Sequence, residues 1–372
     1  MNGNIRVGSL FGIPFYINPS WFLVLGLVTL TYGGQLALFP QLNGAAPWIL
    51  GFAAAILLFA SVLAHELGHS FVAMAQGIEV KSITLFLFGG LASLEKESET
   101  PAQSFWVAIA GPAVSILLFG VFTALNLLLP LPAPFSAVVT LLASLNLILA
   151  LFNLLPGLPL DGGNILKAAV WQITGNSNQG IVFASRVGQL FGGLAVLVGI
   201  LAVLDLSPVG SIWTLLIGWF LLQNAGRSAQ SATVQETLSH YKAEDAVLPD
   251  SPIIPADLTL REFVNEYVIG KPQWSKFLVI DAERKLQGAI ASAALKSVPT
   301  SEWNDIHVRD LVKPVETVNT VNSEQSLLDV IKTLEGQEEK QLVVVREDGV
   351  VVGLLEKASV IKLLQKDRAR AA

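Results

Sequence analysis

The sequence predicts a multi-pass α-helical membrane domain followed by a soluble α/β domain, and charge distribution is the first reason. Residues 1–227 contain six Lys/Arg and seven Asp/Glu, whereas residues 228–372 contain 17 and 22. No residue from 7 to 64 carries a formal charge. The second reason is that the charged part repeats one pattern of strands and helices. We therefore expect a transmembrane domain at 1–227, a linker at 228–245 and a soluble module beyond it.

Six apolar segments predict six transmembrane helices, since about 20 apolar residues cross a bilayer. They cover approximately residues 19–37, 46–74, 102–129, 135–155, 180–204 and 209–225. The second segment is longer than a bilayer requires, so its end at 65–76 is expected to reach the aqueous boundary.

The positions of the basic residues predict the orientation of these helices. Lys and Arg occur in the N-terminus, the second and fourth loops and the C-terminal side, and none occurs in the other loops. Both termini are therefore expected in the cytoplasm, and the protein is expected in the cell membrane.

A metal-binding pattern, His65-Glu66-Leu67-Gly68-His69, ends the second apolar segment. Residues four apart share a helix face, so two imidazoles there can bind Zn²⁺ while Glu66 acts as general base on its water. Such a five-residue pattern also arises by chance. Two histidines and a glutamate in an apolar helix need partners, however, and a metal is the simplest one.

Asp161 is the expected third metal ligand, because such a site needs three protein donors and an open position. It is the only acidic residue between Glu99 and Lys167. It follows the helix-breaking residues Pro156, Gly157 and Pro159, and unwound backbone at membrane depth commonly lines a polar cavity. A helix-end turn with an exposed aspartate is the alternative.

Composition excludes some other functions. A net charge of −6 argues against nucleic acid binding. The absence of cysteine excludes disulfides and thiolate ligands. The first apolar segment lacks a small-residue cleavage pattern, so no cleavable signal is expected.

Two motifs together resemble the site-2 protease family of intramembrane zinc metalloproteases: HELGH at 65–69 and N-x-x-P-x-x-P-x-D-G at 153–162. The resemblance implies that His65, His69 and Asp161 bind one zinc per chain and that Glu66 is catalytic. It places Asn153 near the metal, where its amide could bind the oxyanion or the substrate backbone. Capping the broken helix is the alternative role of Asn153.

Weaker features agree with this resemblance. Residues Ile83–Glu95 resemble the family's membrane-associated β-hairpin, which could bind an unwound substrate as an extra strand or merely pack on the bundle. Ala110-Gly111-Pro112 resembles the third-helix motif, with Ser115 where the family often has Asn. Asn18 stands where a histidine is common.

The function implied is hydrolysis of peptide bonds within or near transmembrane segments of membrane-tethered proteins, that is, regulated intramembrane proteolysis. The family suggests an anti-sigma factor or another tethered regulator as substrate.

The soluble part contains two copies of one pattern, each resembling a cystathionine-β-synthase (CBS) domain, at 246–298 and 308–368. Such pairs often bind adenosine nucleotides through a hydroxyl and an acidic residue. The matching positions hold Ala291 and Ala294 in the first copy and Glu356 and Ser359 in the second. These departures weaken the nucleotide hypothesis and leave dimerisation or substrate gating as the competing role.

Two other function classes remain open. Paired CBS domains also occur on ion transporters, but a transporter is expected to spread polar groups over several spans. Here they concentrate in HELGH and Asp161. A proteolytically inactive scaffold is disfavoured because Glu66 is present.

Overall fold

The computed structural model describes residues 3–87, 89–269, 274–314, 320–336 and 341–371. It contains two compact units, residues 1–233 and 234–372.

Four helices of the described chain are long and apolar enough to cross a membrane: α2 (Ala46–Ala75), α3 (Pro101–Leu128), α4 (Ala133–Asn153) and α6 (Ser177–Val203). The chain is therefore an integral, multi-pass membrane protein, as the sequence predicts. The other two predicted spans differ from this group. Helix α1 (Ser20–Leu36) is apolar but has only 17 residues. Helix α7 (Ile212–Ser239) is 28 residues long and becomes polar beyond its first half.

Helix α7 also corrects the expected linker at 228–245. The helix continues through Arg227 to Ser239, and a short 3-10 turn follows at Ala243–Ala246. Residues 228–239 contain no Pro or Gly. A composition change alone therefore does not end a helix, since Ala and polar residues such as Gln and Glu are good helix formers.

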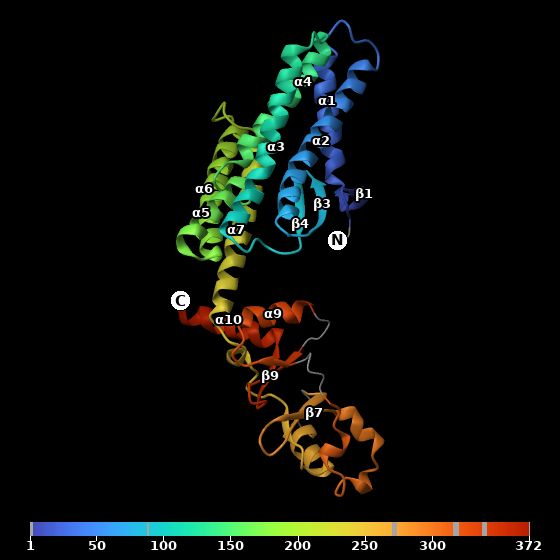
Figure 1. Ribbon diagram of the computed structural model, residues 1–372, viewed down its shortest axis with the longest axis vertical. Coiled ribbons are helices and arrows are strands. Elements are labelled where there is room, and N and C mark those ends of the chain that lie inside the picture. Colours follow the sequence, from blue (N-terminus) through green and yellow to red (C-terminus); the bar gives the residue numbers. More distant parts are fainter. Residues whose placement is uncertain (1–2, 88, 270–273, 315–319, 337–340, 372) are drawn as a thin grey trace. The chain divides into compact units, whose positions relative to one another are not determined.

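A four-stranded sheet accompanies the helices of the first unit. It contains β1 (Ile5–Leu10), β2 (Ile13–Ile17), β3 (Val80–Phe86) and β4 (Gly89–Leu94), in that spatial order. Strands β3 and β4 form the predicted hairpin, with Leu85 opposite Gly90. Figure 1 shows this hairpin beside the C-terminal part of α2, and Ile83 packs with Ala73 there.

The two N-terminal strands were not expected. Strand β2 pairs in parallel with β3, with Phe15 opposite Ile83. Strands β2 and β3 are far apart in sequence, so no local sequence pattern predicts their pairing.

A further helix, α5 (Asp161–Thr174), lies between α4 and α6. Gly175 adopts φ 72° and ends it, and Asn176 starts α6 by accepting hydrogen bonds from the backbone N–H groups of Asn178 and Gln179. The sequence pattern predicts only a connecting loop in this region.

The second unit contains two sheets of identical topology, which confirms the internal repeat. In each, the first strand pairs in parallel with the second, and the second pairs antiparallel with the third. The first copy contains β5 (Ile253–Pro255), α8 (Leu260–Phe263) continued by a π-helical turn at Val264–Val268, β6 (Lys276–Ile280) and β7 (Leu286–Ala291). The second contains β8 (Thr320–Asn322), α9 (Leu327–Gly336), β9 (Gln341–Val345), β10 (Val351–Glu356) and α10 (Lys357–Ala371).

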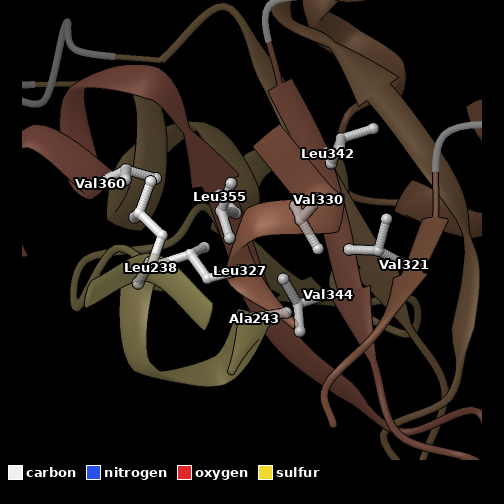
Figure 2. Close-up of a cluster of buried hydrophobic side chains, with 10 residues drawn as sticks. Leu238, Ala243, Val321, Leu327, Val330, Leu342, Val344, Leu355 and Val360 are labelled. Atoms are coloured by element: carbon white, nitrogen blue, oxygen red, sulfur yellow. The ribbon is translucent and has the colours of Figure 1, made fainter. Parts of the chain in front are cut away.

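The core of the second copy draws on the last turns of α7. Leu238 packs in one cluster with Leu327 and Val360, and Figure 2 shows these side chains turned toward one another. The compact unit therefore begins before residue 246, where sequence reasoning placed the first CBS domain.

Candidate metal centre

Helix α2 places His65 and His69 on successive turns of one face. Their side chains are 4% and 12% exposed. Their Nε2 atoms lie 3.3 Å apart, with the ring planes at 79°. Both rings therefore direct a nitrogen to the same point.

Asp161 reaches this point from the start of α5. Its Oδ2 atom lies 3.1 Å from His65 Nε2 and 3.3 Å from His69 Nε2. The irregular segment before it is held against α6, because the backbone N–H of Leu158 donates to the carbonyl oxygen of Ala184 at 3.1 Å. The Asp161 side chain is only 16% exposed, which excludes the alternative of an exposed helix-end aspartate.

Burial favours the neutral form of the Asp161 carboxyl, but hydrogen bonding to His65 and His69 outweighs it. The net effect holds the pKa of Asp161 below its ordinary value. The surroundings of Asp161 therefore favour its carboxylate form, which offers an anionic oxygen to a metal.

The separations between the three donor atoms fit zinc. Donors on a tetrahedral zinc at about 2.0–2.1 Å lie about 3.3–3.4 Å from one another. The separations here are 3.1, 3.3 and 3.3 Å. His65, His69 and Asp161 are the one group of His, Asp and Glu side chains with such spacing among the residues that the structure describes.

Gly111 on α3 keeps the space at these donors open. A Cβ atom at position 111 would lie 2.7 Å from His65 Nε2 and closer still to His69 Nε2. Any side chain there would occupy the space that a metal ion needs. The donor set and the room beside it therefore fit a bound zinc.

The Nδ1 atoms of both imidazoles also have hydrogen-bond partners. His69 Nδ1 lies 2.7 Å from the carbonyl oxygen of Val107, and His65 Nδ1 lies 2.9 Å from the hydroxyl of Ser115. The sequence pattern indicates no role at the metal for Val107 or Ser115, although Ser115 follows the Ala110-Gly111-Pro112 motif.

Glu66 lies between the two histidines in sequence and faces strand β4. It is 9% exposed, and the backbone N–H of Ala92 donates to its carboxylate. Gly90 packs directly against the same side chain. The β-hairpin therefore holds the carboxylate that the sequence predicts to be the general base.

A cavity of about 310 Å³ adjoins these groups. Asn153, at the end of α4, lines it together with Pro159, Asn164 and Lys167. The Nδ2 group of Asn153 donates to the carbonyl oxygen of Leu149 at 3.0 Å. The structure thus brings Asn153 to the cavity, with its amide engaged inside its own helix.

Comparison with known proteins agrees with this geometry. The model of peptidase family M50 matches residues 53–131 and 130–197. A Synechocystis sp. protein, sll0528, which bears the provisional name zinc metalloprotease, is 63% identical over 99% of this chain and 97% of its own. The chain belongs to peptidase family M50. It is thus a zinc metalloprotease of the site-2 protease family, as sequence reasoning predicted.

Two further similar proteins share a lower sequence identity with this chain. Rip3 of Mycobacterium tuberculosis, also provisionally named a zinc metalloprotease, is 32% identical over 98% of this chain and 93% of its own. The solved site-2 protease of Methanocaldococcus jannaschii is 28% identical, with a TM-score of 0.46, over 61% of this chain and 95% of its own.

The matched M50 region contains every donor of the candidate centre, and the CBS model matches residues 305–366. This M50 chain therefore carries a C-terminal CBS domain, which corresponds to the second repeat. Membership of a protease family and the concentration of polar groups at one centre disfavour the transporter alternative.

Proposed function

We propose that this chain is an intramembrane zinc endopeptidase. It hydrolyses peptide bonds within or near transmembrane segments of membrane-tethered substrates. The observation that carries the proposal is the convergence of His65, His69 and Asp161 at zinc-like separations beside Glu66, near the end of a long apolar helix.

His65 Nε2, His69 Nε2 and an Asp161 oxygen would hold one zinc ion per chain. When bound, zinc supplies a Lewis acid that polarises the scissile carbonyl and activates water. Glu66 takes the proton from the attacking water and delivers it to the leaving amine. Ala92 N–H holds that carboxylate in place.

Asn153 can stabilise the oxyanion only after its side chain changes rotamer. Its side-chain N–H is a donor of the kind that stabilises a developing oxyanion. It now donates to Leu149 within α4. A change of side-chain rotamer would free it to reach the cavity.

The edge of β4 offers a binding site for an extended substrate. Strand β4 is the outermost strand of its sheet in the described chain, and the backbone N–H of Ala92 on this strand donates to Glu66. A substrate must unwind to expose its carbonyls, and an added strand satisfies the freed backbone groups with little demand on side chains.

The full membrane arrangement has six spans, with α1 and α7 completing the four long apolar helices. The distribution of basic residues supports a cytoplasmic position of both termini. The metal centre lies toward the cytoplasmic leaflet, where water reaches it.

The CBS pair acts as a regulatory or dimerisation module. A cavity of about 680 Å³ in the second unit is lined by Trp274, Lys276, Glu356, Ser359 and other residues of both copies. Ser359 Oγ accepts from the backbone N–H of Glu356 and donates to its carbonyl oxygen. The hydroxyl is already engaged, which supports docking or dimer contacts over strong adenine-nucleotide binding.

Capture of the substrate tests the proposal. Glu66→Gln removes the general base and leaves the donors in place. This variant should co-purify from membranes with an intact membrane-tethered protein, such as an anti-sigma factor, that the wild-type chain cleaves. Cleavage of that protein by Glu66→Gln at the wild-type rate would contradict the proposal. The His65→Ala variant serves as a second inactive control.

A further inference from the structure

The Nδ1 atoms of the two imidazoles in the candidate metal centre have different kinds of hydrogen-bond partner. His69 Nδ1 lies 2.7 Å from the backbone carbonyl oxygen of Val107. A carbonyl oxygen only accepts, so this bond requires the proton on Nδ1 and leaves the Nε2 lone pair free for a metal. The backbone supplies this constraint whatever side chain stands at position 107.

His65 depends on a side chain instead. Its Nδ1 atom lies 2.9 Å from Ser115 Oγ, and Ser115 on α3 is fully buried. When Nε2 binds a metal, Nδ1 must carry the proton, and the hydroxyl of Ser115 must accept it. An N–H group without an acceptor at this buried position would be strongly disfavoured.

We infer that Ser115 is a positioning residue of the zinc site. Its hydroxyl holds the His65 ring in the tautomer and orientation that present Nε2 to the metal, next to Asp161 Oδ2 at 3.1 Å. The inference rests on the proposed zinc site. It predicts that the His65 half of the site is sensitive to one hydroxyl group, whereas the His69 half is held by the backbone.

Simple packing is the competing role for a buried serine. Ser185 on α6 is the matched case, since it is equally buried. In the part of the chain that the structure describes, its hydroxyl has no hydrogen-bond partner. Removing each hydroxyl therefore separates loss of packing from loss of the bond to His65.

The experiment measures zinc affinity of the purified full-length chain in chelator-buffered zinc. Ser115→Thr and Ser115→Val have nearly the same shape and differ in the hydroxyl. We expect Ser115→Val and Ser115→Ala to bind zinc about 10–100-fold more weakly than wild type, the usual effect of losing a partner of a ligating histidine. Ser115→Thr and Ser185→Ala should bind it nearly as wild type does.

A second readout is the absorption spectrum of the Co²⁺-loaded protein, which reports ligand geometry. Ser115→Val should alter this spectrum, and Ser115→Thr should preserve it. Equal zinc affinities and equal spectra for the Thr and Val variants would overturn the role of Ser115. If wild type and Asp161→Ala bound zinc equally weakly, the metal centre itself would be refuted, and the role of Ser115 with it.

Discussion

Gly90 on β4 lies so close to Glu66 on α2 that a Cβ atom at position 90 would stand 2.8 Å from Glu66 Oε1. The two residues belong to elements that meet only through the tertiary fold. The strand can approach Glu66, the proposed general base, this closely because position 90 has no side chain.

Gly90→Ala should therefore displace either Glu66 or the strand edge. We expect zinc to stay bound and cleavage to fall about 100-fold, since a displacement of about 1 Å at a reacting group has such an effect. The measurement is the cleavage rate of the substrate captured with Glu66→Gln. Gly8→Ala on β1 is the control, because a Cβ there meets nothing within 4 Å. A wild-type cleavage rate for Gly90→Ala would contradict the expected close contact between β4 and Glu66.

Gly111→Ala should weaken zinc binding instead. The new methyl group would fill the space beside the two Nε2 atoms, so we expect zinc content to drop well below one per chain. Gly120→Ala lies on the same helix with nothing within 4 Å of its Cβ, and it should retain zinc. Elemental analysis of the purified proteins compares them, and full zinc occupancy in Gly111→Ala would place the ion elsewhere.

Ligand and base variants should separate binding from catalysis. His65→Ala, His69→Ala and Asp161→Ala each remove one donor, so each should lower zinc content. Glu66→Gln should keep about one zinc and lose about 10²–10⁴-fold in rate, the usual contribution of a general base. Full zinc retention in Asp161→Ala would assign the third ligand to another residue.

Membrane topology can be read from reporter fusions. Fusions after Leu38 and Pro130 fall between helices α1 and α2 and between α3 and α4. They should report an extracytoplasmic position, whereas fusions after Lys96 and Arg227 should report the cytoplasm. An extracytoplasmic reporter after Arg227 would refute the six-span arrangement.

The CBS pair should bind adenine nucleotides weakly or not at all. Ala291 and Ala294 lack the polar groups for a ribose, and Ser359 is bonded to Glu356. Calorimetry with ATP and AMP should use residues 234–372, because Leu238 belongs to the core of this unit. A clear binding isotherm with a micromolar dissociation constant would contradict a module that acts mainly through docking or dimer contacts.

Deletion of residues 234–372 should leave zinc binding intact and change the cleavage rate or the choice of substrate.

Much of the centre could be predicted from sequence, for a local physical reason. The spacing of His65 and His69 places them on one helix face in any fold that keeps the helix. Asp161 stood out because few charged residues occur in an apolar region. The hairpin and the repeats were visible through turn residues and alternating strands.

What the sequence by itself determined is the chemistry of the donors and the apolar helices, because both follow from residue type and short-range periodicity. The tertiary structure decided what surrounds those donors. Ser115 reaches His65 across 50 residues of sequence, and strand β2 meets β3 in a parallel pairing. Such partners depend on which helix faces and strand edges meet. Packing of the whole unit decides which faces and edges meet, so no local pattern of residues can predict these contacts.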